Sequence, residues 1–378
     1  MVTAMSKSAN MSQFQAHKPA AAAGGARRFE AVVLRLDRYT PDVIGLTLAP
    51  ADGAPFTYRP GQYLSVILDD GRRRSFSMAN DTDRGRLIEL HVRRRPGGRF
   101  SDEMLTRLKA GDRLLVEGPY GHLDWRENGG TVLLMGAGTG LAPLKALIEH
   151  GLAVGGACPI HLYWSGRTPE ALYLSPHLHR LAQNHERFKF TPLLSRPHPA
   201  WPGRRGYVQD AVAEDFTSLH TAIVYACGSP PMIQAARARL GALPGFHEDH
   251  FLTDAFEPAE TPPQATTTAA LSLCVSHRGE DRRVAAASGS TLLAALQAAG
   301  APVLSVCGGK ASCGACKISV SPVWLNRIAP PERTERRLLA NLEGVGPCDR
   351  LSCQIHLTPE VDGLAVSLAP ETTALWPA

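Results

Sequence analysis

Four cysteines near the C-terminal end of the chain have a spacing suited to binding inorganic iron and sulfide. Three lie close together as C-x5-C-x2-C and the fourth follows after 36 intervening residues: Cys307, Cys313, Cys316 and Cys353. Four thiolates are the ligands of a [2Fe–2S] cluster. Three ligands on one tight loop require close backbone approach, which Gly308, Gly309 and Gly314 permit with little steric penalty. The spacing therefore predicts a cluster-binding loop.

Structural zinc is the alternative chemistry for these thiols. Zinc sites commonly pair two CxxC units, or one CxxC with histidines. The second pair in this chain would be Cys348-x4-Cys353, which does not fit that spacing. We therefore expect the cluster. Cys348 leaves the fourth ligand open, because 31 residues separate it from Cys316.

A glycine-rich turn lies near the middle of the chain. Gly136, Gly138 and Gly140 follow an apolar strand and precede a helix, an arrangement that brings backbone N–H groups to a phosphate. Leu141 occupies the position of the third glycine in the dinucleotide fingerprint, so the turn is G-x-G-x-G. By itself such a turn is weak evidence for a dinucleotide site.

The segment before this turn predicts an antiparallel barrel. From Phe29 to Glu127, short strands are broken by Gly and Pro, at 30–36, 62–68, 87–92 and 113–117. A helix is expected at Ser101–Lys109, with Ser101 as its N-cap.

The pattern changes from residue 130 to about 258. Apolar runs at 131–135, 160–164, 188–194 and 222–226 alternate with helical patterns at 143–150, 172–183 and 231–240. Strands buried on both faces and alternating with helices predict a parallel α/β sheet.

A polar, proline-rich linker is expected at 258–269, followed by an α+β module. The module is expected to contain two strands, a helix at 291–299, the Cys-Gly loop, a strand, a helix at 332–341 and two closing strands. The predicted organisation is a disordered leader at 1–27, a barrel at 28–128, an α/β domain at 129–257, the linker and a β-grasp module at 270–378.

This last module resembles a ferredoxin domain of the plant-type fold. Its x5 spacing departs from the x4 of plant ferredoxins and is similar to the adrenodoxin-like branch. The resemblance favours Cys353 as the last ligand, because Arg-Leu-Ser-Cys-Gln is expected to open a strand there, and Cys348 is then a half-buried thiol.

The barrel resembles the flavin domain of the ferredoxin–NADP reductase superfamily. The resemblance lies in Arg-Pro-Gly-Gln-Tyr-Leu-Ser-Val from Arg59, then Arg74-Ser75-Phe76-Ser77. It implies that Arg74 pairs with the flavin phosphate, since a guanidinium fork suits that anion. It places Phe76, in place of the commoner Tyr, beside the flavin, and Ser77 near flavin N5.

Further flavin-binding residues follow from the same resemblance. The segment 96–101 matches the family element whose amides meet the pyrophosphate, and 115–121 matches the closing barrel strand. The expected cofactor contacts are then Ser75, His91, Gly97, Gly98 and Ser101.

Two elements resemble the nicotinamide site of the family: the turn 136–143 and Tyr-Ala-Cys-Gly-Ser-Pro-Pro-Met at 225–232. The resemblance implies that Thr139 and Cys227, with Gly228, flank the nicotinamide, and that Phe256 approaches the flavin ring.

The domain order resembles the reductase component of multicomponent oxygenases. It implies that NAD(P)H reduces a flavin (FAD, or FMN in a minority branch), which passes single electrons through the [2Fe–2S] cluster to a separate terminal oxygenase. No catalytic acid or base is expected, because the cofactors carry the chemistry.

Ser195 and Arg196 occupy positions that NADPH enzymes use, but Pro197 and Pro199 depart from that pattern, which slightly favours NADH. The alternatives are a stand-alone reductase of small acceptors and a redox sensor.

Composition and sequence pattern also bear on nucleic-acid binding, membrane insertion and secretion. Lys and Arg number 40 against 35 Asp and Glu, a net charge of +5 that does not argue for nucleic acid. No apolar run approaches the ~20 residues of a membrane span. The first 27 residues lack the apolar core of a signal peptide, so a cytoplasmic protein with ligating rather than disulfide-bonded cysteines is expected.

Overall fold

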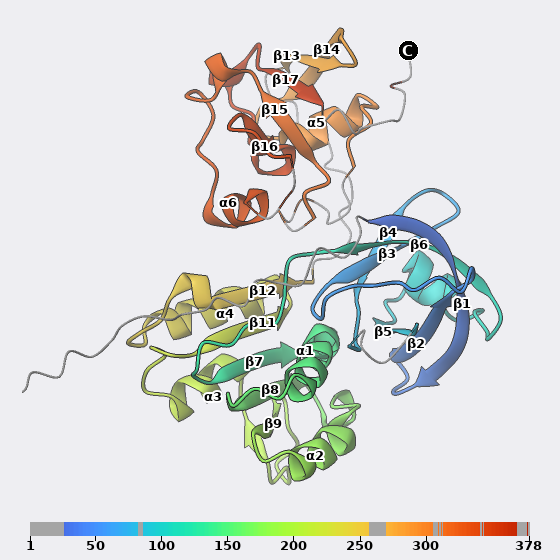
Figure 1. Ribbon diagram of the computed structural model, residues 1–378, viewed down its shortest axis with the longest axis vertical. Coiled ribbons are helices and arrows are strands. Elements are labelled where there is room, and N and C mark those ends of the chain that lie inside the picture. Colours follow the sequence, from blue (N-terminus) through green and yellow to red (C-terminus); the bar gives the residue numbers. More distant parts are fainter. Residues whose placement is uncertain are drawn as a thin grey trace, which may run out of the picture.

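The computed structural model describes residues 26–81, 86–256, 270–304, 309, 311, 313–340, 342, 344–368 and 376. These residues form three sheets in succession along the chain (Figure 1). Cys307, the expected linker and residues 1–25 of the expected leader lie outside the described residues.

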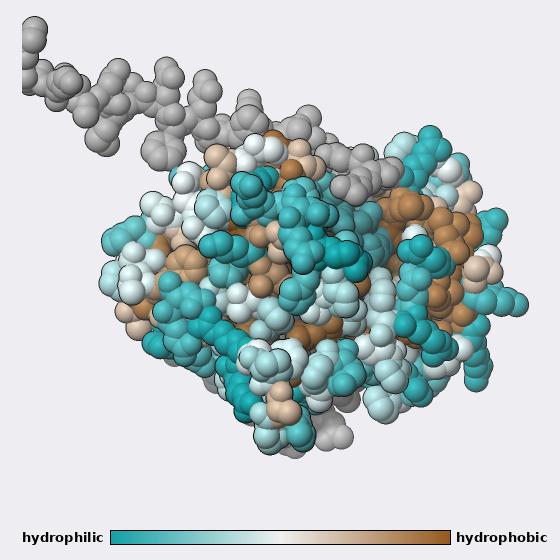
Figure 2. Space-filling view, turned by 90° about the horizontal axis from the view of Figure 1, so that it is seen from below, coloured by the Kyte–Doolittle hydropathy of each residue, from teal (hydrophilic) through white to brown (hydrophobic). Residues whose placement is uncertain are grey.

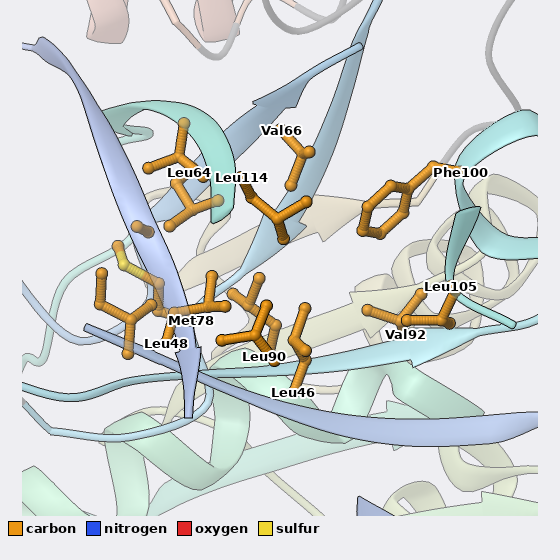
Figure 3. Close-up of a cluster of buried hydrophobic side chains, with 14 of the residues drawn as sticks. Leu46, Leu48, Leu64, Val66, Met78, Leu90, Val92, Phe100, Leu105 and Leu114 are labelled. Atoms are coloured by element: carbon orange, nitrogen blue, oxygen red, sulfur yellow. The ribbon is translucent and has the colours of Figure 1, made fainter. Parts of the chain in front are cut away.

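The first sheet is antiparallel, in the order β4-β3-β6-β1-β2-β5. Its strands are β1 (Arg27–Arg38), β2 (Val43–Pro50), β3 (Tyr63–Ile67), β4 (Arg73–Ser77), β5 (Ile88–Arg93) and β6 (Arg113–Tyr120). An antiparallel bridge between Met78 and Leu90 joins its two edges and closes the barrel. Apolar side chains from all around the barrel, including Leu46, Leu64 and Leu114, meet in its core (Figure 3).

The helix expected at Ser101–Lys109 is wrong. The segment is a short π-helix, η2 (Arg99–Met104), with Gly98 at its N-cap. Leu105 N donates to Phe100 O at 2.8 Å, the i to i+5 bond of that helix type. Phe100 and Leu105 are both buried in the barrel core. Residues five apart point in different directions on an α-helix, so the wider turn lets both side chains reach the core.

The second sheet is parallel, in the order β10-β9-β8-β7-β11-β12. Its strands are β7 (Val132–Ala137), β8 (Ile160–Gly166), β9 (Phe188–Leu194), β10 (Arg204–Arg205), β11 (Ile223–Gly228) and β12 (Phe251–Ala255). Its helices are α1 (Leu141–Ala153), α2 (Ser175–Asn184), α3 (Val208–Asp215) and α4 (Pro230–Gly241). Side chains of α1 and α2 share one core layer with the sheet, and those of α3 and α4 share another. The sequence pattern did not predict α3.

The third sheet is mixed, in the order β14-β13-β17-β15-β16, and only β13 and β17 pair in parallel. Its elements are β13 (Ala270–His277), β14 (Glu280–Ala287), α5 (Leu292–Ala298), β15 (Lys317–Val320), α6 (Arg333–Leu339), β16 (Asp349–Leu351) and β17 (Ala365–Leu368). Helix α5 packs on this sheet, and the Thr291 side chain caps it by accepting from Ala294 N at 3.2 Å.

An antiparallel barrel, a parallel α/β sheet and an α+β module therefore follow one another, which confirms the expected fold class. Figure 2 shows one face of the molecule, where hydrophilic residues dominate and apolar ones form separate patches. Within the described part of the chain, no helix has both the length and the apolar composition needed to cross a bilayer.

Candidate functional site

The elements that carry the predicted flavin and nicotinamide residues meet at the carboxyl edge of the parallel sheet. There, Cys227 on β11 is paired with Gly136 on β7 and with Asp254 on β12. Ligands of open α/β sheets bind at this edge. The barrel reaches the same edge through Ser77, the last residue of β4.

The contact between barrel and sheet is a hydrogen bond. The buried Ser77 Oγ donates to Asp254 Oδ2 at 2.8 Å, across 177 residues of sequence. Asp254 is the neighbour of Cys227 in the sheet. The predicted flavin N5 residue and the predicted nicotinamide residue are therefore linked through one residue, Asp254, whose side chain bonds to Ser77 and whose backbone pairs with Cys227.

Cys227 lies in a fully buried, tightly packed position. A side chain at Gly140 would place its Cβ only 2.1 Å from Cys227 O, so the close approach of the glycine turn to β11 requires glycine there. Burial, and then the charge of Asp254, raise the pKa of the Cys227 thiol well above its ordinary value. Cys227 is therefore a neutral thiol suited to packing rather than to nucleophilic attack.

The glycine turn forms a 3-10 helix, η3 (Gly138–Gly140), that leads directly into α1. Trp164 Nε1 donates to Gly138 O at 2.9 Å and holds the turn against β8. The half-buried Thr139 stands at its centre. At the neighbouring strand end, Phe256 N donates to Gly228 O at 2.7 Å, which places Phe256 beside β11.

Arg74 is a part-buried cation with no ion pair among the described residues. Its guanidinium donates to Arg73 O at 2.8 Å. Burial, and then repulsion from Arg72, lower the pKa of Arg74. A bound phosphate would relieve both effects, so this residue fits the flavin phosphate.

The other residues of this strand have protein partners. Ser75 Oγ lies 3.1 Å from Ser65 Oγ, and the Phe76 ring packs 5.2 Å from the Phe100 ring at 47°. Phe76 thus continues the apolar core toward the predicted flavin position.

The expected pyrophosphate element is a tight turn before η2. A side chain at Gly98 would place its Cβ 2.6 Å from Ser101 Oγ, which excludes larger residues. Ser101 Oγ accepts from Arg95 N at 3.2 Å, and Gly97 N donates to Asp102 Oδ2 at 2.8 Å. The backbone N–H of Gly97 in this turn is therefore already bonded to an anion, the Asp102 carboxylate.

His91 lies between the two domains, and both ring nitrogens have partners there. Nε2 lies 2.9 Å from Glu89 Oε1, and Nδ1 lies 3.0 Å from the Tyr173 hydroxyl. Burial lowers the pKa of His91, so the ring is neutral near pH 7. Its side chain therefore joins the domains instead of offering a free nitrogen to a cofactor.

The described cysteines of the predicted cluster gather at the end of the third sheet. Cys316 and Cys353 are both buried in one small apolar cluster with Ala311. A hydrogen bond with Cys353, and then burial, raise the pKa of the Cys316 thiol. Ala315 N donates to Cys313 Sγ at 3.4 Å. Sulfur ligands that accept N–H bonds fit an iron–sulfur cluster.

Two further observations concern this group of cysteines. Gln354 Nε2 donates to Gly309 O at 2.8 Å and to Cys353 Sγ at 3.2 Å, which ties the predicted ligand loop to the predicted last ligand. Among the residues described, no three His, Cys, Asp or Glu side chains surround a single metal position. A cluster of two irons shares its four thiolates between them and does not need such a group.

The structure favours Cys353 over Cys348 as the fourth ligand. The ladder of β15 and β16 pairs Lys317, next to Cys316, with Leu351, close to Cys353. Cys348 O instead accepts from Val320 N at the far end of β15, roughly 10 Å away at strand spacing. Cys353 follows β16 in a 3-10 turn, η7 (Ser352–Gln354), so the strand expected to open there is wrong.

The cluster loop also contacts the barrel. Cys313 and Ala315 pack against the rings of Tyr63 and Tyr120. Tyr63 is the ladder partner of Ser77 on the adjacent strand. One side of this strand pair thus faces the predicted cluster, and its end faces the nucleotide domain.

Several residues at this site were not predicted from sequence. They are Asp254 as the partner of Ser77, Tyr63 and Tyr120 under the predicted cluster loop, the buried Lys145, and its half-buried partners Glu89 and Glu149. Among these residues, only Lys145 and Glu149 have a pattern that is recognisable in the sequence, the i, i+4 spacing of opposite charges on a helix.

Three family models match the chain in succession. They are the oxidoreductase FAD-binding domain at residues 38–125, the oxidoreductase NAD-binding domain at 134–238 and the 2Fe-2S iron-sulfur cluster binding domain at 275–358. The chain therefore has domains for FAD, for NAD(P)H and for a [2Fe–2S] cluster.

Curated relatives match mainly over part of their length. Protein RfbI of Salmonella typhimurium is 35% identical over 217 residues, which are 57% of this chain and 64% of that protein. The chain spans 64–65% of the first relatives it matches. Terephthalate 1,2-dioxygenase, reductase component 1, of Comamonas sp is 36% identical over 60% of this chain and 69% of that protein.

Solved structures agree on the fold. The Amycolatopsis cytochrome P450 reductase GcoB shares 32% identity and a TM-score of 0.58, over 62% of this chain and 71% of that one. An intact type IV self-sufficient cytochrome P450 monooxygenase covers 90% of this chain and 41% of its own, with 20% identity and a TM-score of 0.63, which supports the fold alone. With the three domains in this order, the chain belongs to the ferredoxin–NADP reductase superfamily, among the members that carry a C-terminal [2Fe–2S] domain.

Proposed function

We propose that this protein is an NAD(P)H-dependent flavin and iron–sulfur oxidoreductase that delivers electrons to a separate terminal oxygenase. When bound, NAD(P)H supplies a hydride, the flavin separates its two electrons, and the cluster carries them one at a time. The names of relatives support an oxygenase as the electron acceptor. Reductase components of terephthalate 1,2-dioxygenase and of propane 2-monooxygenase are among these relatives.

The packing of Cys313 against Tyr63 carries this proposal. Tyr63 lies opposite Ser77 in the β3 and β4 ladder, so a cluster ligand is one strand pair from the residue predicted to meet flavin N5. That arrangement suits transfer of electrons from a flavin in the barrel to a cluster in the third domain.

The chain's own residues bind and orient the groups. Arg74 would hold the flavin phosphate, Ser77 the edge of the flavin ring, and Thr139 and Cys227 the nicotinamide. Cys307, Cys313, Cys316 and Cys353 would bind the two irons. Phe256 would lie against the flavin ring. We assign no residue as an acid or base.

The test is anaerobic mixing of purified protein with NADH or NADPH. The flavin absorbance should bleach first, and an electron paramagnetic resonance signal of a reduced [2Fe–2S] cluster should follow. The protein alone should metabolise no organic substrate, and addition of its oxygenase should start NAD(P)H-dependent hydroxylation.

Other outcomes would identify the alternatives. Rapid turnover with quinones or ferric chelates, without transfer to cytochrome c or an oxygenase, would indicate a stand-alone reductase. A cluster that is reduced without sustained NAD(P)H turnover would indicate a redox sensor.

We also propose a cytoplasmic location. The seven cysteines in the described part of the chain form no disulfide, as is typical of a reducing compartment. Fractionation of the native cells would test this.

A further inference from the structure

Lys145 is a nearly buried cation at the boundary between the barrel and the nucleotide domain, with 8% of its surface exposed. Its Nζ donates to Ala79 O at 3.0 Å and to Glu89 Oε2 at 2.8 Å, both in the barrel. It lies 3.0 Å from Glu149 Oε1 on its own helix. An ammonium group has three N–H donors, so these acceptors satisfy it completely.

On the barrel side, the acceptors belong to the segment that follows Ser77. Ala79 is two residues beyond Ser77, and its N–H donates to Glu89 O at 2.7 Å. The Glu89 carboxylate also pairs with His91 Nε2. Lys145 is thus bonded to the same short backbone segment that carries the predicted flavin N5 contact.

On the nucleotide side, Lys145 belongs to the helix that the glycine turn opens. Helix α1 begins directly after Gly138–Gly140, and Lys145 lies about one helical turn from its start. One turn further, Glu149 accepts from Asp81 N at 3.1 Å, and His150 Nδ1 lies 3.1 Å from Asp81 Oδ2. One face of α1 is therefore bonded to the barrel at several points.

We propose that Lys145 is a positioning residue for hydride transfer, because its ammonium fixes the spacing between the nicotinamide turn and the Ser77 segment. This inference rests on the proposed function, in which NAD(P)H reduces a flavin. The two cofactor sites lie on different domains, so only contacts that cross the boundary can set their distance. Misplacement of a reacting pair by about 1 Å lowers a rate by about 100-fold.

Loss of the ammonium alone would not separate positioning from stability. Lys145→Met leaves the half-buried carboxylates Glu89 and Glu149 near each other without a cation, which destabilises the fold whatever the role of Lys145. The decisive variant is Lys145→Met/Glu89→Gln. It removes one cation and one anion, keeps the length of both side chains and leaves the net charge unchanged.

The experiment measures flavin reduction by NADH and NADPH in an anaerobic stopped-flow instrument, with full-length protein. Lys189→Met is the control, because Lys189 is an exposed lysine of the same domain. Flavin content and thermal midpoint are recorded for each variant. The long-wavelength absorbance of the nicotinamide–flavin complex reports how the two rings stack.

We expect the double variant to keep its flavin and a thermal midpoint within about 3 °C of the parent. Its flavin reduction should be about 10- to 100-fold slower, with a weaker long-wavelength band. Lys189→Met should match the parent. Should Lys145→Met fail to fold, the double variant still decides the question.

The inference is overturned if the double variant reduces its flavin at the parental rate with an unchanged long-wavelength band. Lys145 would then only stabilise the interface. Failure of the parent itself to be reduced by either nucleotide would instead contradict the proposed function, so the two failures are distinguishable.

Discussion

The hydroxyl group of Ser77 donates a 2.8 Å hydrogen bond to Oδ2 of Asp254, and this bond joins the barrel to the parallel sheet. Asp254 sits between the two predicted cofactor residues, because it is also the strand neighbour of Cys227. The relative placement of flavin and nicotinamide therefore depends on contacts between domains as much as on either domain alone.

Ser77→Ala should slow flavin reduction. The substitution leaves the Asp254 carboxylate without this donor and removes the predicted contact to the flavin edge. A hydrogen bond to a charged group contributes about 1.5–3 kcal/mol, so the rate should fall roughly 10- to 100-fold. Stopped-flow mixing with NADH or NADPH measures the rate of flavin reduction. Thr57→Ala is the control, because it removes an exposed hydroxyl group on the barrel. Parental rates in Ser77→Ala would remove Ser77 from the site.

Arg74→Ala should yield flavin-poor protein whose cluster spectrum is intact. The variant lacks the part-buried guanidinium that fits the flavin phosphate, and charge-assisted bonds of this kind contribute about 1.5–3 kcal/mol. Flavin affinity should fall at least tenfold, measured as flavin released on dilution. Arg113→Ala removes an exposed barrel arginine that pairs with Glu30 and should retain its flavin. Equal flavin content in both variants would refute the assignment.

Cys313→Ser should abolish cytochrome c reduction, while ferricyanide reduction by the flavin continues. The substitution removes one thiolate from the cluster but leaves the barrel and nucleotide domain complete. Loss of both activities would contradict the modular electron path.

Cys348→Ser and Cys353→Ser should separate the two candidates for the fourth ligand. Iron and sulfide content should stay at the parental value in Cys348→Ser and fall in Cys353→Ser, because only Cys353 is close to Cys316. The reverse result would show that Cys348 is the ligand.

The interface between the barrel and the nucleotide domain should lose stability in acid. Burial by itself would raise the pKa of Glu89, but the hydrogen bond from His91 and the charge of Lys145 lower it to about 2. A carboxyl group whose pKa is lower in the folded state stabilises fully above its ordinary pKa of 4.5 and loses that contribution as pH falls toward 2.

Glu89→Gln isolates this contribution. Near pH 7 the variant should be less stable than the parent by about 2 kcal/mol, the size of a charge-assisted hydrogen bond. The difference should shrink between about pH 4.5 and pH 2, where the parental carboxyl becomes protonated. Urea unfolding at several pH values measures it, and a difference independent of pH would contradict an electrostatic origin in the Glu89 carboxylate.

The local pattern of residues determined most of the element types and the chemistry of the cluster. Buried runs such as β7 and β11 have apolar side chains on both faces, as is typical of a parallel strand covered on both sides. The helix expected at 291–299 is α5, and in the structure the Thr291 hydroxyl caps it by accepting from Ala294 N. The C-x5-C-x2-C spacing predicted the ligand loop, since close ligands on one loop need no knowledge of distant contacts.

The tertiary structure alone decided how these parts meet. Ser77 and Asp254 are 177 residues apart, and Lys145 meets Glu89 only because the barrel and the parallel sheet pack against each other. The π-helix at Arg99–Met104 likewise follows from two side chains that must both reach the barrel core. Sequence patterns report the environment of each element, whereas the distance between elements depends on packing that no short segment encodes.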